Sequence, residues 1–243
     1  MLASVVFSQP DNEREGIILN NQGVAQFQKG EYEEALKSFN HSAEIFPANA
    51  TVHRNLGHLY FELKDYSRSE AAFRNALRLA PDHAATYNQL GTALMEEKRY
   101  KEALETFLKA VEMQPDDAII LMNTGNARIA LKDYRSAIES LERARSLKPE
   151  HVGIRVSLGF AYGMRKKFDL AIAEARYAVR IDPKNGDAQF LLGSLYVAKH
   201  DKDGAIAQHR TVAALNPELA RTLYQVIYSD MILVVPQSSL GPK

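Results

Sequence analysis

The chain has 243 residues, of which 46% are hydrophobic and 25% are charged, a composition typical of a globular protein with its own core. Its 30 Lys and Arg residues balance 30 Asp and Glu residues, so the net charge indicates neither a nucleic-acid partner nor an anionic membrane surface. The absence of cysteine excludes disulfides and thiolate metal sites, and no apolar run approaches the roughly 18 residues that a membrane span requires.

We expect residues 1–15 to form an N-terminal tail. Its apolar stretch LASVVFSQ precedes the charged DNERE and lacks the basic start and the longer apolar core of a complete secretory signal. Two interpretations remain open: a disordered tail, or the remnant of a truncated export signal. We expect a cytoplasmic protein on the first interpretation, and an exported or periplasmic protein on the second.

An internal repeat of 34 residues organises the rest of the chain. Glycine recurs at this interval, at Gly23, Gly57, Gly91, Gly125, Gly159 and Gly193. Proline recurs at the same interval, at Pro47, Pro81, Pro115, Pro149, Pro183 and Pro217. Such a period indicates a stack of similar units. Six units fit, at residues 16–49, 50–83, 84–117, 118–151, 152–185 and 186–219.

Each unit has the pattern of two amphipathic helices joined by a short polar turn. In the second unit the apolar spacing predicts helices over 51–63 and 66–79, which must run antiparallel because the turn is so short. A glycine inside a helix costs about 1 kcal/mol relative to alanine. We expect Gly57, with the small Ser69 on the second helix, to let the two helices approach closely. Pro81 ends the unit because it disfavours helix before it.

Further columns share the period. Aromatic residues stand at Tyr32, Tyr66, Tyr100, Tyr134 and Phe168, and small residues at Ala35, Ser69, Ala103, Ala137, Ala171 and Ala205. Together with the glycine and proline columns, these make the chain resemble the tetratricopeptide repeat family. The resemblance implies an all-α fold: a right-handed superhelical α-solenoid of helix-turn-helix repeats, with the first helix of each pair on the concave side.

A capping helix is expected over 220–235, followed by a disordered tail over 236–243. Pro217 can open a helix, and an apolar stripe follows at Leu219, Leu223, Val226 and Ile227. Further apolar side chains remain, at Tyr224, Tyr228, Met231, Ile232, Val234 and Val235. They either pack on the sixth repeat or form a face for a partner or for a homodimer.

The sequence contains no phosphate loop, nucleophile elbow or helical zinc motif, so we expect no catalytic residue, no metal and no cofactor. His53 and His58 are five residues apart, which does not suit two metal ligands on one helical face. His83 and His151 occupy the same turn position in different units and are expected to point outward. The protein is predicted to bind partners rather than to catalyse a reaction.

One position of the first helix carries amides in four consecutive repeats. It holds Asn21, Asn55, Gln89, Asn123, Ser157 and Leu191. An amide can both donate to and accept from the backbone of an extended peptide. The row is similar to the asparagine ladder in the repeat domain of O-linked N-acetylglucosamine transferase. The alternative is that asparagine is simply common at this position of the family.

The predicted site has a polar and an apolar part. The peptide-binding residues are Asn20, Asn21, Arg54, Asn55, His58, Asn88, Gln89, Thr92, Asn123 and Asn126. The apolar groove residues are Ile119, Met122, Ile129, Val156, Phe160, Phe190 and Val197. A matching partner is an extended protein segment that is polar and then apolar. Alternatively, the apolar residues cover one another or receive the chain's own tail.

Two departures from the family pattern affect the predicted partner and the predicted packing of the repeats. The chaperone-binding members carry a carboxylate clamp of Lys and Asn, then Asn, then Lys and Arg; the matching positions here retain only Asn55, so we do not expect binding of chaperone tails. Arg128 and Arg155 stand where other repeats carry Tyr. Either they reach outward along their aliphatic stems, or the junction of repeats four and five packs loosely as a hinge.

Overall fold

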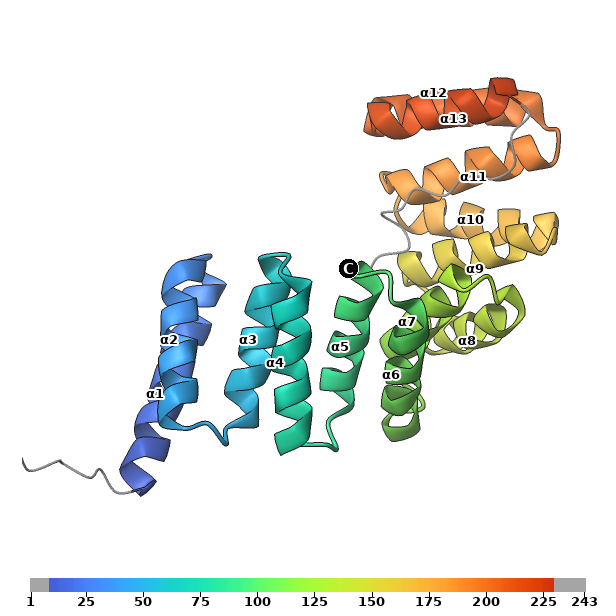
Figure 1. Ribbon diagram of the computed structural model, residues 1–243. Helices are drawn as coiled ribbons and strands as arrows, with labels where there is room; N and C mark the ends of the chain where they lie inside the picture. Colours follow the sequence, from blue (N-terminus) through green and yellow to red (C-terminus); the bar gives the residue numbers. More distant parts are fainter. Residues whose placement is uncertain (1–8, 230–243) are drawn as a thin grey trace, which may run out of the picture. The chain divides into compact units, whose positions relative to one another are not determined.

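The computed structural model describes residues 9–229, in which it contains thirteen α-helices and no strand (Figure 1). This confirms the expected all-α class. In chain order the helices are α1 (Gln9–Gln28), α2 (Tyr32–Ile45), α3 (Ala50–Glu62), α4 (Tyr66–Leu79), α5 (Ala84–Glu96), α6 (Tyr100–Met113), α7 (Ala118–Ala130), α8 (Tyr134–Leu147), α9 (Val152–Met164), α10 (Phe168–Ile181), α11 (Gly186–Ala198), α12 (Lys202–Leu215) and α13 (Pro217–Ser229).

The chain divides into two compact units, Met1–Met113 and Gln114–Lys243. In the first unit α1 packs on α2, α3 on α4 and α5 on α6; in the second, α7 packs on α8, α9 on α10 and α11 on α12, with α13 against both α11 and α12. Within each unit the first helices of neighbouring pairs also touch, α1 with α3 and α3 with α5, α7 with α9 and α9 with α11. We call these the first-helix layer, and the second helices of the pairs the second-helix layer.

The first helix begins earlier than the repeat boundary predicts, at Gln9 rather than Gly16. Pro10 lacks an N–H that the first turn would leave unbonded, and Asp11 places a negative charge at the positive end of the helix. Residues 9–15, predicted as tail, are therefore helical. Residues 2–8 of the candidate export-signal remnant lie outside the described residues.

The glycine repeated in the first helices makes room for a large side chain on the second helix of the same pair. A Cβ built at Gly57 would lie 2.5 Å from Cε1 of Phe73, far inside van der Waals contact. Ser69 contributes as well, because its Oγ donates to the Gly57 carbonyl at 2.8 Å. The same crowding recurs in three other pairs, Gly23 with Phe39, Gly91 with Phe107 and Gly125 with Leu141. The predicted close approach of the two helices is thus seen at the side-chain level.

A left-handed residue ends the first helix of every pair. Lys64 has φ 60°, and its N–H bonds to Phe61 O at 2.9 Å while the Asp65 N–H reaches back to Tyr60 O at 2.8 Å. This is a Schellman motif, which is usually built on glycine. The same column holds Gly30, Lys98, Lys132, Lys166 and His200, all with positive φ. The Asp65 carboxylate then caps the N-terminus of α4 by accepting from the Arg68 N–H at 3.0 Å.

Arg128 and Arg155 fit neither expectation, an outward-reaching side chain or a loosely packed junction. Arg155 is only 8% exposed; its guanidinium pairs with Glu174 at 2.6 Å and lies 3.5 Å above the ring of Tyr177. Arg128 donates to Ser136 O at 2.9 Å. Neither side chain simply reaches outward. Arg155 Nε also donates to Pro149 O of repeat four at 2.6 Å, so the junction of repeats four and five is tied by a hydrogen bond rather than loosely packed. A buried arginine requires such a partner because an unpaired buried charge is costly.

The described part of the C-terminal helix is α13, which covers residues 217–229 and so includes the first ten residues of the predicted span 220–235. Leu223 and Val226 are buried, and Leu223 and Ile227 belong to one apolar cluster with Phe190 of α11, whereas Tyr224 is 53% exposed. The described part of the predicted stripe therefore packs on the sixth repeat. The Tyr228 side chain, residues 230–235 of the predicted helix and the predicted tail at 236–243 lie outside the described residues.

Candidate peptide-binding surface

The amides of the first unit pair between neighbouring helices. Asn55 Nδ2 of α3 donates to Asn20 Oδ1 of α1 at 2.8 Å, and Asn20 Nδ2 reaches Asn21 Oδ1 at 3.4 Å. Asn20 is 5% exposed, Asn55 is half-buried and Asn21 is exposed. An amide offers two donor hydrogens and an acceptor oxygen, so one lateral bond leaves Asn55 the capacity for a further partner.

Gln89 continues the row on α5 through a histidine. Its Nε2 bonds to Nε2 of His58 on α3, while its Oε1 is buried and has no hydrogen-bond partner. Burial lowers the pKa of His58, and the positive charge of Arg54 lowers it further. His58 is therefore neutral at pH 7 and can accept the amide hydrogen. Its ring also meets the edge of Phe73, with centroids 5.7 Å apart, which holds it in place.

The remaining polar candidates of the first unit also lie on this layer. Arg54 is half-buried; its Nη1 lies 3.0 Å from His83 Nε2, and its Nη2 donates to Thr51 Oγ1 at 3.1 Å. Thr92 Oγ1 donates to the Asn88 carbonyl at 2.9 Å, and both residues are half-buried. The first unit thus brings amide, imidazole and guanidinium groups together on α3 and α5, partly open to solvent.

The second unit offers a much more buried layer. Asn123 and Asn126 of α7 are each 5% exposed. Five of the predicted groove residues are buried as well, Met122, Ile129, Val156, Phe160 and Phe190, whereas Ile119 and Val197 are half-buried. These five side chains are thus largely shielded from solvent in the described structure. The polar part of the predicted surface in the first unit is the more accessible one.

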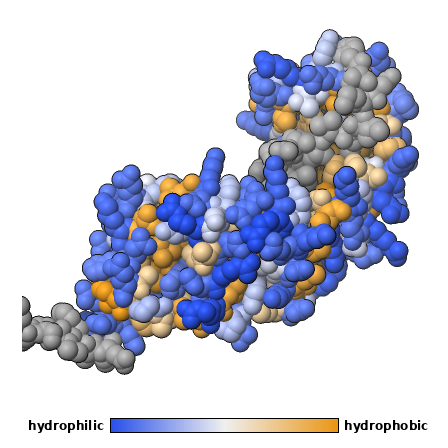
Figure 2. Space-filling model, viewed as in Figure 1, coloured by the Kyte–Doolittle hydropathy of each residue, from blue (hydrophilic) through white to orange (hydrophobic). Residues whose placement is uncertain are grey.

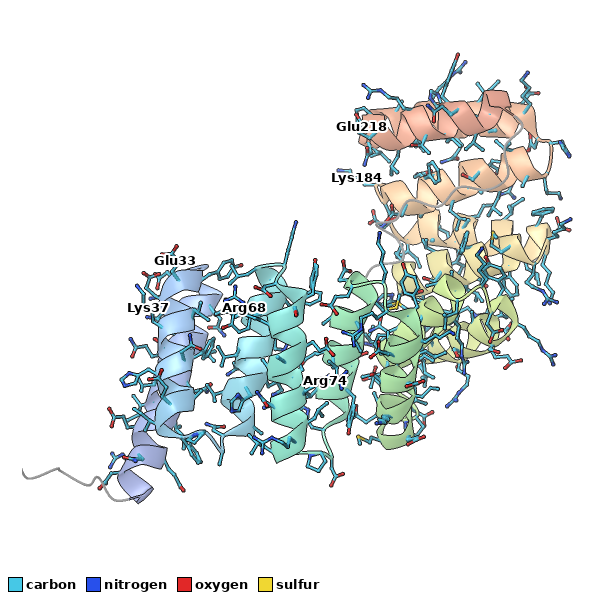
Figure 3. The ribbon with its side chains drawn as sticks, in the orientation of Figure 1. Glu33, Lys37, Arg68, Arg74, Lys184 and Glu218 are labelled. Carbon is cyan, nitrogen blue, oxygen red and sulfur yellow. The ribbon has the colours of Figure 1, made fainter. Side chains whose placement is uncertain are left out.

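Charged side chains of the first unit pair with one another on the second-helix layer and the turns. Arg74, labelled in Figure 3, belongs to α4. It bonds to Glu70 at 2.7 Å, and Arg99 bonds to Glu70 at 2.5 Å and to Glu102 at 2.6 Å. In the view of Figure 2 hydrophilic side chains dominate this unit, with smaller hydrophobic patches among them. Because these charges are already paired, this layer presents no field of one sign to a partner.

Sequence reasoning missed the role of two histidines. His83 and His151 were expected to point outward, but each turns back onto the helix that follows it: Nδ1 of His83 lies 3.2 Å from Thr86 N, and Nδ1 of His151 accepts from Ile154 N at 3.3 Å. Burial lowers the pKa of both rings. They stand where other units carry Asn49, the cap of α3, so comparison of this column could have revealed the capping role.

A buried ion-pair network was also missed. Glu174 on α10 is 7% exposed and binds Arg155 of α9 and Arg145 of α8. The signal was present in the sequence, because Glu174 interrupts a column otherwise held mostly by small residues such as Ser140. The network links three helices of the second unit and is part of its core rather than of a surface.

A shallow cleft lies between α12 and α13. It has a volume of about 390 Å³ and is lined in part by His209, Ala213, Ala220 and Tyr224. The rings of His209 and Tyr224 are 5.8 Å apart. Among residues 9–229, no helix is long and apolar enough to cross a membrane, and no group of three candidate metal ligands is present.

Sequence comparison with protein families gives two matches. A model described as a tetratricopeptide repeat matches residues 54–118, 122–186 and 161–220, and one described as a TPR repeat matches residues 23–64. No curated protein sequence matches the chain.

Several solved structures have a similar fold. A structure of PilF from Pseudomonas aeruginosa has a TM-score of 0.76 at 20% identity and covers 91% of this chain and 100% of its own. PilW, described as a widely conserved type IV pilus biogenesis factor, has a TM-score of 0.78 at 20% identity, covering 86% and 98%. YrrB, described as a TPR protein with an unusual peptide-binding site, has a TM-score of 0.61 at 22% identity, covering 77% and 97%. At these identities the likeness shows the fold.

Proposed function

Because the chain belongs to the tetratricopeptide repeat family, we propose that it is a non-catalytic scaffold that holds an extended segment of a partner protein on its first-helix layer. The polar part of this layer, around Asn55, His58 and Gln89, makes the first contacts with the segment's backbone. One observation carries the proposal: Gln89 Oε1 is buried without a hydrogen-bond partner, in a side chain whose Nε2 bonds to the neutral imidazole of His58.

An unpaired buried acceptor costs about 1–3 kcal/mol, and native proteins contain few of them. A backbone N–H of a bound segment would satisfy Gln89 Oε1, and the amide of Asn55 has capacity for a second bond. Contacts of this kind recognise the backbone and are tolerant of sequence, which suits an extended peptide. The peptide-binding site described for YrrB supports the proposal by analogy of fold.

The test removes the amides without disturbing the helices. We expect Asn55→Ala/Gln89→Ala to stay folded but to lose its partners in a quantitative pull-down from the source organism. The lost bond from Asn55 to the buried Asn20 should lower the free energy of unfolding by about 1–3 kcal/mol. The matched control is Asn40→Ala/Asn75→Ala, which removes two exposed asparagines from the second-helix layer. If the amide variant captures the same proteins with the same yield as the control, the first-helix layer of this unit is not the binding site.

A second candidate function is self-association through α12 and α13. The observation that favours it is the 53% exposure of Tyr224 beside the cleft between these helices. Sedimentation at two concentrations tests it: a dimer that disappears in Tyr224→Lys supports this candidate. Leu170→Lys, which charges a 48% exposed leucine on α10, is the control. A monomer at both concentrations in the wild type would eliminate it.

A further inference from the structure

Two buried polar atoms of the second unit lack a hydrogen-bond partner. They are Asn126 Oδ1 on α7 and Ser194 Oγ on α11, in side chains that are 5% and 1% exposed. The two residues occupy the same position of the 34-residue repeat, and Phe160 holds that position on α9 between them. An orphaned buried group requires an explanation, since leaving it unpaired costs about 1–3 kcal/mol.

Apolar residues stand one helical turn before these positions. Four residues before each position, on the same face of its helix, stand Met122, Val156 and Phe190, all buried. We call the six residues Met122, Asn126, Val156, Phe160, Phe190 and Ser194 the unit-two face. Its residues lie on three helices, of which α7 contacts α9 and α9 contacts α11. An apolar strip with an isolated acceptor and a hydroxyl suits an extended apolar segment, whose backbone N–H and C=O groups also need partners.

The described chain ends beside this face. Ile227, near the end of α13, belongs to one apolar cluster with Phe190, and Val197 of α11 packs against the same cluster. Val197 and Ile227 also line a small pocket of about 170 Å³. The residues that follow Ser229 therefore start next to the α11 end of the unit-two face.

The sequence after α13 is apolar, which is the character that a segment docked on the unit-two face requires. Five apolar residues follow one another from Met231 to Val235, and Pro236 comes next. Burying one such side chain is worth about 1.5–3 kcal/mol. Six extended residues after Ser229 span about 20 Å. Packed helices lie about 8–10 Å apart, so this length reaches from α11 across α9 to α7.

We propose that residues 231–235 dock on the unit-two face of their own chain. The segment lies over α11, α9 and α7, and its backbone bonds to Asn126 Oδ1 and Ser194 Oγ. The docking stands independently of any partner. Its consequence for regulation rests on the proposed function: a partner segment can occupy the unit-two face only by displacing these residues.

Because the chain has no cysteine, a single probe can be placed in the full-length protein. A nitroxide label on Ser238→Cys lies just beyond the proposed docking segment, and its paramagnetic broadening of backbone amide signals reports nearby residues. We expect broadening at Asn126, Phe160 and Ser194, and its loss when Ile232→Asp/Val234→Asp is added. Leu170→Asp, at a 48% exposed position of α10, is the control and should leave the broadening unchanged.

Three outcomes would overturn the proposal. The first is that these amides keep full intensity in the labelled protein. The second is that the broadening survives the two aspartates. The third is that isotope-labelled protein without the nitroxide is broadened as strongly when mixed with nitroxide-labelled protein at natural abundance, which would assign the contact to a second copy. The measurement contains no partner, so its failure is distinct from failure of the pull-down with the amide variant.

Discussion

The close approach of the paired helices makes Gly57→Ala the most informative stability test. The added Cβ would lie 2.5 Å from Cε1 and 2.6 Å from Cδ1 of Phe73, a ring that is 1% exposed and cannot swing into solvent. Overpacking of this kind costs about 1–3 kcal/mol. Alanine returns about 1 kcal/mol through its higher helix propensity. Because a contact of 2.5 Å places this site in the upper half of the range for overpacking, we expect a net loss of about 1–2 kcal/mol in the free energy of unfolding.

Gly159→Ala is the matched control. The fifth repeat carries Ala175 in place of the ring, and a Cβ at Gly159 would find its nearest atoms, Ala171 O and a Leu191 methyl, at 3.2 Å. The helix-propensity gain then roughly offsets the crowding, so we expect a change within about 0.5 kcal/mol.

Urea denaturation of both variants, with hydrogen exchange of α3 and α4 to locate the loss, provides the measurement. In a Phe73→Ala background, where the ring is gone, Gly57→Ala should no longer destabilise the protein. The reasoning is refuted if Gly57→Ala is as stable as the wild type, or if Gly159→Ala costs as much.

Three further predictions concern the turn, the caps and the buried ion pair. Lys64→Gly should raise the unfolding free energy by about 0.5–1 kcal/mol in urea titrations, because glycine adopts the left-handed conformation without strain; an unchanged midpoint would contradict this. The lowered pKa values of His83 and His151 mean that protons bind the unfolded chain more readily, so stability is full above about pH 6.5 and falls as the pH drops below it. His83→Asn/His151→Asn should reduce this slope in unfolding curves at pH 7.5 and 5.5, and an equal slope would exclude the caps as its source. Glu174→Ala should cost about 3 kcal/mol because it leaves Arg155 buried without its carboxylate, and adding Arg155→Met should recover much of the loss; a double variant no more stable than the single one would show that the pair is not the cause.

The helical repeat could be predicted from the sequence because its signals are local and recur in register. Gly57, Ser69 and Pro81 each carry a physical requirement, and the helices of that repeat begin and end within a residue of the predicted bounds, at 50–62 and 66–79. The glycine could also be assigned a packing role, since a helix tolerates it only where close approach repays the lost propensity.

Other features depend on tertiary context that a single sequence does not display. Lys64 has no intrinsic preference for the left-handed region, so its conformation follows from the motif that ends the helix. His151 was expected to point outward, because a histidine near a turn does not by itself identify a cap. The pairing of Arg155 with Glu174 joins two helices over 19 positions, and only the packing of α9 on α10 brings them together.

The sequence predicts the repeat position of the candidate amides but not their accessibility. Periodicity places Asn55, Gln89 and Asn123 at one position of successive first helices. It does not say that Asn55 bonds laterally to Asn20, or that Asn123 is 5% exposed while Asn55 remains half-buried. Burial depends on everything that packs over a helix face, which is a property of the assembled unit.

Site-specific photo-crosslinking in the source organism tests the central claim most directly. A photoreactive amino acid replaces Thr92, half-buried on the first-helix layer of the first unit, or Lys101, exposed on its second-helix layer. We expect the probe at position 92 to crosslink one partner protein through an extended segment, and the probe at position 101 not to do so. Crosslinks to that partner from position 101 alone, with none from position 92, would contradict that claim.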